Sequence, residues 1–198
     1  PISADYEAYI GLWDLISPYS VLVGITTVAL FMMHGAIYLV MKTEGEIQQK
    51  VKGWVNNTII FLVICYVAVT MATLLYVPHM TEHFRDFPGI FFIALLNMLA
   101  IANIPREIHH ERYFRAFLSS CASILFLLAI FAIGMFPNIV LSDPNPEHSL
   151  NVYNAASSQR TLNIMLIIAI IGMPFVLAYT ISIYWIFRGK VKLDAMSY

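Results

Sequence analysis

Histidine offers the most specific chemistry in this sequence, because its imidazole can bind a haem iron or a zinc ion. His34 lies within a long apolar segment, and Thr27, His34, Tyr38 and Met41 recur at the spacing of one helix face. An ionisable residue at membrane depth is a functional candidate, so one interpretation of His34 is a haem ligand. The alternative is an uncharged imidazole that hydrogen bonds to a neighbouring helix. The sequence favours this alternative, because no other apolar segment has a histidine at similar depth.

A second pattern, His79-Met80-Thr81-Glu82-His83, fits the H-x-x-E-H form of a zinc protease helix. Pro78 breaks a helix just before it, and nothing nearby supplies the third protein ligand of a catalytic zinc. Cys65 and Cys121 both fall inside apolar segments, where they act as small apolar residues. The sequence therefore predicts no catalytic, metal-binding or cofactor-binding residue in this chain.

The elements that position these residues are membrane helices. Of 198 residues, 60% are hydrophobic and 12% are charged, about half the charged fraction of a soluble domain. A membrane-spanning helix needs about 20 mostly apolar residues. The sequence predicts an all-α fold, a polytopic membrane bundle that forms a single transmembrane domain over residues 1–198, with five spans at about 18–41, 53–77, 87–104, 112–136 and 160–187.

The basic residues predict the orientation, because lysine and arginine favour cytoplasmic loops. Only Arg85 and Arg160 lie on the other side of the predicted membrane. We therefore expect the N-terminus outside and the C-terminus in the cytoplasm. The cytoplasmic set follows spans one, three and five and comprises Lys42, Lys50, Lys52, Arg106, Arg112, Arg115, Arg188, Lys190 and Lys192.

A long polar stretch, residues 137–159, separates the last two spans and forms the predicted outer loop. Phe136-Pro137 ends the fourth span, residues 143–146 (DPNP) force an open turn, and Ser157 or Ser158 caps the fifth helix. Loops of this length are usually functional or make contacts elsewhere. We expect this loop to dock on a partner. Its candidate contact residues are Phe136, Tyr153, Ser157, Ser158 and Arg160.

Local patterns predict one turn, one helix end, one kink and one site of close packing. We expect a solvated turn over residues 42–50, an end of the third span at Pro105, and a kink in the fifth span near Pro174. Small residues also recur at helical spacing in the fourth span, which predicts close helix packing there. This small-residue seam comprises Ala116, Ser119, Ser120 and Ser123.

Several stretches together resemble one known family, the second subunit of cytochrome bd quinol oxidases. The matches extend from the first span to the last, and the outer loop carries the most specific ones. They are Pro18 with its apolar span, residues 35–39 (GAIYL) with 42–46 (KTEGE), 134–137 (GMFP), 154–159 (NAASSQ), 161–163 (TLN), and Tyr184-Trp185 before a basic tail.

The resemblance implies a terminal oxidase of the bacterial cytoplasmic membrane that oxidises quinol at the outer face and reduces dioxygen to water. Haems b and d would lie in the first subunit. The second subunit would be a haem-free scaffold of nine spans, which can also hold a structural quinone in a groove of aromatic and methionine residues, where an ordinary lipid tail would also fit. This chain resembles only its second part, because the family's first four spans have no counterpart here. Pro1 in place of an initiator methionine also predicts a piece of a longer protein.

The resemblance implies as partners the haem-bearing subunit I, the missing N-terminal part of subunit II, lipid and quinol, and small accessory subunits. We expect no nucleic-acid partner. Two alternatives remain. A haem-ligating cytochrome b-type subunit would need paired histidines within the membrane. A transporter or channel half would need a polar midplane site on broken helices, for which Pro174 with Gly172 is the only support.

Overall fold

A computed structural model describes residues 11, 13, 16–77, 88–142 and 145–190. Its five long helices confirm the predicted all-α fold, because each is long and apolar enough to cross a membrane. They are α1 (Pro18–Lys42), α2 (Gly45–Tyr76), α4 (Gly89–His109), α5 (Tyr113–Met135) and α6 (Gln159–Ile186). The segment between α5 and α6 holds two short strands, β1 (Asn138–Val140) and β2 (Leu150–Asn151), and a short 3-10 helix, η2 (Pro146–His148).

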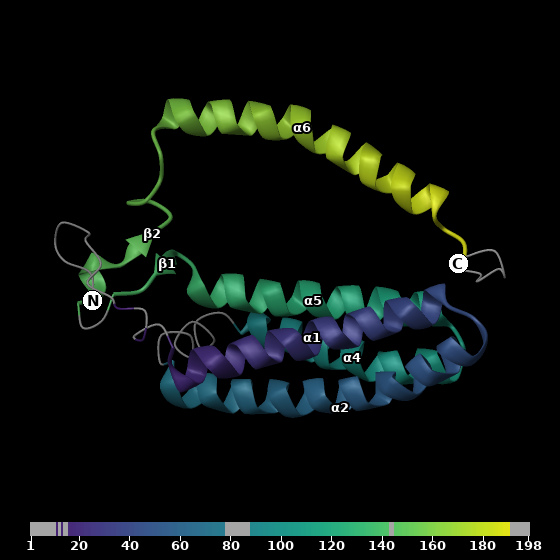
Figure 1. Cartoon of the computed structure of the whole chain (residues 1–198). Helices are drawn as coiled ribbons and strands as arrows, with labels where there is room; N and C mark the ends of the chain where they lie inside the picture. Colours follow the sequence, from purple (N-terminus) through teal and green to yellow (C-terminus); the bar gives the residue numbers. More distant parts are fainter. Residues whose placement is uncertain (1–10, 12, 14–15, 78–87, 143–144, 191–198) are drawn as a thin grey trace.

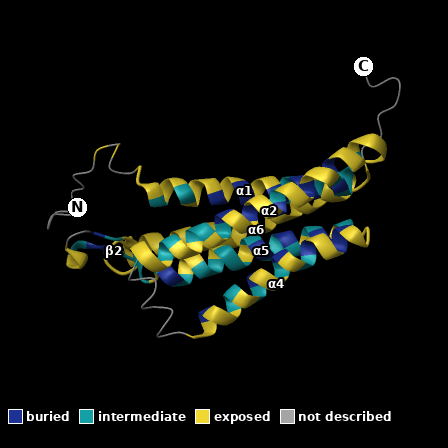
Figure 2. Cartoon of the chain, turned by 90° about the horizontal axis from the view of Figure 1, so that it is seen from below, coloured by how far each residue is buried: buried dark blue, intermediate teal, exposed yellow. Residues whose placement is uncertain are grey.

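Four of the helices form a bundle, in which α1 packs against α2 and α5, and α4 packs against α5 (Figure 1). Met33 and Ile37 of α1 and Leu62 of α2 are fully buried in its core. Figure 2 shows buried residues (dark blue) alternating with exposed ones (yellow) along the helices of the bundle. In a membrane the lipid is as apolar as leucine, so such a core is held by close packing and interhelical hydrogen bonds.

The starts of α1 and α6 follow their sequence signals. Ser17 caps α1: its hydroxyl accepts a bond from the Ser20 backbone N–H at 3.0 Å, and Pro18 occupies the first turn. At α6 the cap is Ser158, whose hydroxyl accepts a bond from the Thr161 backbone N–H at 3.4 Å. Both caps satisfy an amide that would otherwise lack an intrahelical partner.

The boundary predicted for α2 is wrong by more than one turn. The helix begins at Gly45 instead of Gly53, so the turn after α1 is much shorter than the expected 42–50. Residues 45–52 lack proline and are mostly good helix formers, and Val51 and Val55 place this extension against the core. Gly45 has a φ of 64°, a conformation that glycine adopts without steric cost, which allows the tight turn.

The predicted end of the third span at Pro105 is also wrong. Helix α4 continues through Pro105 to His109. Proline removes one helical hydrogen bond, but Ile104 and Ile108 on either side are buried in the core and hold the last turn in place. This difference moves residues 106–109 from a predicted loop onto a helix.

The outer loop contains structure that the sequence did not predict. Strands β1 and β2 pair antiparallel, with Asn138 opposite Asn151. The turn after β2 is closed by the Asn151 carboxamide oxygen, which accepts bonds from the backbone N–H groups of Tyr153 and Asn154 at 2.9 Å each. Of the open turn predicted over residues 143–146, Asp143 and Pro144 lie outside the described residues, whereas Asn145 is the N-cap of η2 and Pro146 is its first residue. The hairpin brings the C-terminal end of α5 and the N-terminal end of α6 to the same end of the molecule (Figure 1).

Helix α6 stands apart from the bundle, and none of its residues is buried. It is continuous through Pro174 and bends along its length (Figure 1), as the proline predicted. Its far end is attached to the bundle, because the Lys42 ammonium donates to the Phe187 carbonyl oxygen at 2.8 Å and the Lys190 ammonium lies 3.5 Å from Glu44. The partner of the Ile170 carbonyl, which Pro174 leaves without a helical donor, stays a prediction.

Candidate functional site

The small-residue seam of α5 is the centre of a polar cluster within the bundle. Three of its serines hydrogen bond to side chains on other helices: Ser123 donates to Asn97 of α4 at 2.8 Å, Ser119 accepts from Asn103 of α4 at 2.9 Å, and Ser120 pairs with His34 of α1 at 2.8 Å. Ala116, Ser120 and Ser123 are fully buried. The seam therefore gives close packing, as predicted, and also links three helices by polar contacts.

His34 takes part in this cluster through its Nδ1 atom. The Ser120 hydroxyl has one hydrogen, which it donates to the Phe117 carbonyl oxygen at 2.7 Å, so His34 Nδ1 is the donor in the histidine–serine bond. The imidazole ring also lies 5.0 Å from the Phe117 ring. The hydrogen bond to a neighbouring helix that the sequence favoured is thus present, and it fixes the orientation of the imidazole.

Two buried polar side chains were not identified from the sequence as site residues. Asn97 is fully buried and Glu107 is 5% exposed, and within the described part of the chain Asn97 Nδ2 and Glu107 Oε2 have no hydrogen-bond partner. Such an atom costs about 1–3 kcal/mol. The helical spacing of Asn97 from Ile90, Ile101 and Ile104 places it on the buried face of α4 and could have identified it from the sequence. Glu107 could not be identified in this way, because the sequence predicted that the helix ends at Pro105 and that Glu107 lies in a loop.

The partner-contact candidates lie at the opposite end of the fold from Glu107, around the hairpin. Phe136, the C-cap of α5, is 53% exposed, and Tyr153, just after β2, is 74% exposed. Ser157 and Arg160 are also exposed. Ser158 is exposed, but its hydroxyl is already bonded to Thr161 of its own helix. The structure therefore brings these candidates to one end of the molecule and shows that one of them has an intramolecular role.

Within the described residues, the remaining histidines and the two cysteines do not form a metal site. The His79–His83 motif lies outside the described residues. His109 and His110 are exposed at the end of α4, and within the described ranges no group of three or more histidine, cysteine or acidic side chains could hold a metal ion. Cys65 is buried as a free thiol and Cys121 is half-buried.

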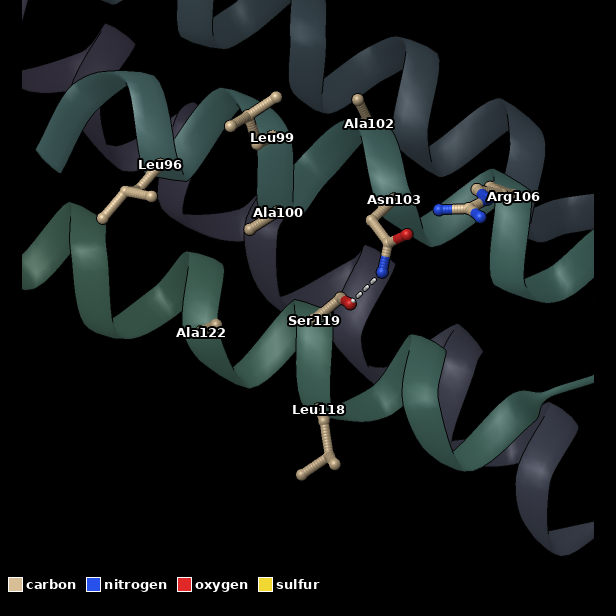
Figure 3. A pocket seen from close by; sticks show the side chains of 9 residues that line it. All are labelled: Leu96, Leu99, Ala100, Ala102, Asn103, Arg106, Leu118, Ser119 and Ala122. Carbon is tan, nitrogen blue, oxygen red and sulfur yellow. Dashed lines mark hydrogen bonds between the residues drawn. The ribbon is translucent and has the colours of Figure 1, made fainter. Parts of the chain in front are cut away.

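Two grooves lie on the surface of the bundle. One, of about 640 Å³, runs between α4 and α5 and has Asn103, Arg106 and Ser119 at its polar end (Figure 3). The other, of about 290 Å³, lies between α1 and α2 and is apolar. Phe31, Met32 and Trp54 line it together with Gly35. The lining of the second groove thus includes two aromatic residues and a methionine.

Comparison with known proteins supplies the family. The family model for cytochrome bd terminal oxidase subunit II matches residues 1–187. The chain is 26% identical over 199 residues to cytochrome bd ubiquinol oxidase subunit 2 of Bacillus subtilis, covering 97% of this chain and 56% of that protein. It is 23% identical over 209 residues to cytochrome bd-I ubiquinol oxidase subunit 2 of Escherichia coli, covering 92% of this chain and 55% of that protein. The chain thus spans about half the length of the curated relatives it matches.

Proposed function

This chain belongs to the cytochrome bd terminal oxidase subunit II family, and on that premise we propose that it forms part of the second subunit of a quinol:oxygen oxidoreductase. The observation that carries the proposal is the family match, which extends over all five membrane-length helices. In this proposal the complex oxidises quinol and reduces dioxygen to water, and the haem-bearing subunit I carries haems b and d. This chain acts as a haem-free scaffold in the bacterial cytoplasmic membrane.

The use of polar residues inside the bundle supports the scaffolding role. Ser119, Ser120 and Ser123 each bond to a side chain of another helix, and these bonds fix the packing of α1, α4 and α5. Interhelical hydrogen bonds of this kind contribute about 0.6 kcal/mol each on average in membrane proteins. Three such bonds on one helix favour a rigid support over a moving carrier.

The distribution of charge supports the orientation with the C-terminus in the cytoplasm. Basic side chains from three helices and their turns meet at one end of the fold: Lys42 bonds the end of α6, and Lys52 lies 3.4 Å from Glu111 in the turn after α4. Arg160 lies at the other end, near the hairpin. The outer loop then faces the quinol side, where it docks on subunit I or on the first part of subunit II.

A tagged version of the chain tests this function. The tag is placed at the C-terminus, and the complex is purified from native membranes in mild detergent. We expect the purified material to carry the absorption bands of haems b and d and to consume oxygen with quinol as donor. Material that contains this chain without haem, or that lacks quinol-dependent oxygen uptake, would overturn the proposal. A cytochrome b spectrum without haem d would instead support the haem-ligating alternative.

The groove between α1 and α2 is the proposed place for a structural quinone. Its apolar lining by Phe31, Met32 and Trp54 suits an isoprenoid tail. A Cβ atom on Gly35 would meet nothing within 4 Å, so Gly35→Leu fills the groove without a backbone clash. We expect this variant to lose quinone from the extracted complex while it keeps its haems. Unchanged quinone content, or no quinone beyond the catalytic site in the unmodified complex, would assign the groove to a lipid tail.

A further inference from the structure

The groove between α4 and α5 combines a charged end with an apolar floor. The charged end is formed by Arg106 and Asn103 of α4 and Ser119 of α5 (Figure 3). The apolar floor continues the groove toward the middle of the membrane and is formed by Leu96, Leu99 and Ala100. From Arg106 to Leu96 the helix rises by about 15 Å, at 1.5 Å per residue. The groove therefore extends from the membrane boundary to about the middle of a 30 Å hydrocarbon core.

The polar end is equipped to bind an anion. Asn103 Nδ2 donates to Ser119 Oγ at 2.9 Å, so the serine hydroxyl keeps its own hydrogen to donate elsewhere. Figure 3 shows the Arg106 side chain extending beside Asn103. Arg106 is exposed, and among the described residues no carboxylate forms a salt bridge with it. A guanidinium in this position can donate two parallel hydrogen bonds to a phosphate.

A second arginine, Arg115, lies on α5 one helical turn from Ser119, next to the polar end of the groove. Arg115 precedes Ser119 by four residues in α5, and this spacing places both on one helix face. It is exposed, and it too has no salt bridge in the described ranges. Arg106 and the Ser119 hydroxyl thus line the headgroup end of the groove, and Arg115 adds a second cation one helical turn from Ser119, whereas alanine and leucine side chains form most of the rest of the groove.

We propose that the α4–α5 groove binds an anionic phospholipid. Arg106, Arg115 and Ser119 hold its phosphate, and one acyl chain lies over Leu96, Leu99 and Ala122. The ligand is a lipid and not a free phosphate, because the cationic end of the groove is continuous with an apolar surface that is long enough to hold an acyl chain. It is a lipid and not a protein helix, because arginines that form no salt bridge with any described residue match, at headgroup depth, the anionic surface of the membrane. Nothing in the proposed oxidase function requires this site.

Lipid titration of the purified complex tests the site. The complex is stripped of lipid, reconstituted in detergent, and titrated with palmitoyl-oleoyl phosphatidylglycerol, and bound lipid is counted by native mass spectrometry. One basic residue near the membrane surface is worth about 1 kcal/mol toward an anionic lipid, which is about fivefold in affinity. We therefore expect Arg106→Gln and Arg115→Gln each to weaken binding of one lipid about fivefold, and the double variant about 25-fold.

Matched controls separate this site from general charge and from a soluble anion. Lys50→Gln removes an exposed cation from the same end of the fold, on α2, and should leave that binding step unchanged. Ala122→Leu narrows the apolar floor and should weaken phosphatidylglycerol but not glycerol phosphate. Phosphatidylcholine with the same chains should bind at least tenfold more weakly.

Three results would overturn the proposal. Equal affinity for phosphatidylcholine and phosphatidylglycerol would show that the groove does not select an anionic headgroup. Full competition by glycerol phosphate would show that the polar end binds a soluble anion and not a lipid. Cross-linking from Leu118→Cys, at the groove, to a helix of another subunit in the intact complex would show that protein covers the groove.

Discussion

Removing the Ser123 hydroxyl should weaken the α4–α5 interface more than any other single-atom change in the polar cluster. Ser123 and Asn97 are both fully buried, and the Ser123 hydroxyl donates a hydrogen bond of 2.8 Å to Asn97 Oδ1. Asn97 Nδ2 already has no partner in the described part of the chain. Ser123→Ala therefore leaves the whole Asn97 carboxamide without a hydrogen-bond partner among the described residues.

The size of the effect follows from two limits. A buried polar group left without its partner costs about 1–3 kcal/mol, whereas interhelical hydrogen bonds measured in membranes reach at most about 1.7 kcal/mol. We expect a loss of about 1–2 kcal/mol in the free energy of unfolding. The measurement is the midpoint of unfolding by sodium dodecyl sulfate in mixed micelles, with the complex intact.

Two further variants make this prediction sharp. Asn97→Leu in the Ser123→Ala background removes both polar groups, and should recover most of the lost stability because nothing polar remains unpaired. Thr27→Ala is the matched control: Thr27 is exposed and its hydroxyl donates only to the Val23 carbonyl oxygen of its own helix. If Ser123→Ala is no worse than Thr27→Ala, or if the double variant is less stable than the single one, the buried-pair reasoning is wrong.

Three more predictions follow. His34→Gln keeps a side-chain donor for Ser120 and should leave the haem bands of the complex intact; loss of a haem band would contradict the scaffold proposal. Glu107→Gln should keep or raise the unfolding midpoint, because it removes a buried carboxylate whose Oε2 has no partner in the described ranges; a loss of stability as large as that of Ser123→Ala would mean that the complex supplies one. Tyr153→Ala with Arg160→Gln should weaken subunit association or quinol-dependent turnover, and unchanged assembly, melting temperature and turnover would reduce the loop to a tether.

Much of the fold could be predicted because each membrane helix carries its own signal. An apolar run of sufficient length predicts a span without knowledge of its neighbours, and the caps at Ser17 and Ser158 depend on only a few adjacent residues. The end predicted for α4 was wrong because tertiary packing outweighed a local rule. Proline usually ends a helix, but Pro105 lies between two core isoleucines that hold the next turn in place.

The polar cluster could be predicted only in part. Helical spacing places Ser119, Ser120 and Ser123 on or near one face of α5, but it does not reveal which partner each one meets. That depends on the relative register of α4 and α5 and on the approach of α1, which no local pattern encodes. His34 was identified because histidine is rare at membrane depth. Asn97 was not identified, although its helical spacing from Ile90, Ile101 and Ile104 places it on the same face of α4 as these core residues.

The outer-loop residues show how an intramolecular bond limits a sequence-based contact prediction. Ser157 and Ser158 are neighbours, and either could cap α6 from the sequence alone. In the structure Ser158 is the cap and its hydroxyl is bonded to Thr161, so it contributes to the helix start before any partner arrives. Tyr153 differs, because its side chain is 74% exposed beside an asparagine turn that fixes its backbone. A rigid turn that presents an aromatic ring loses little conformational entropy on docking, which is why Tyr153, together with the exposed Arg160, is where substitution tests the docking role most directly.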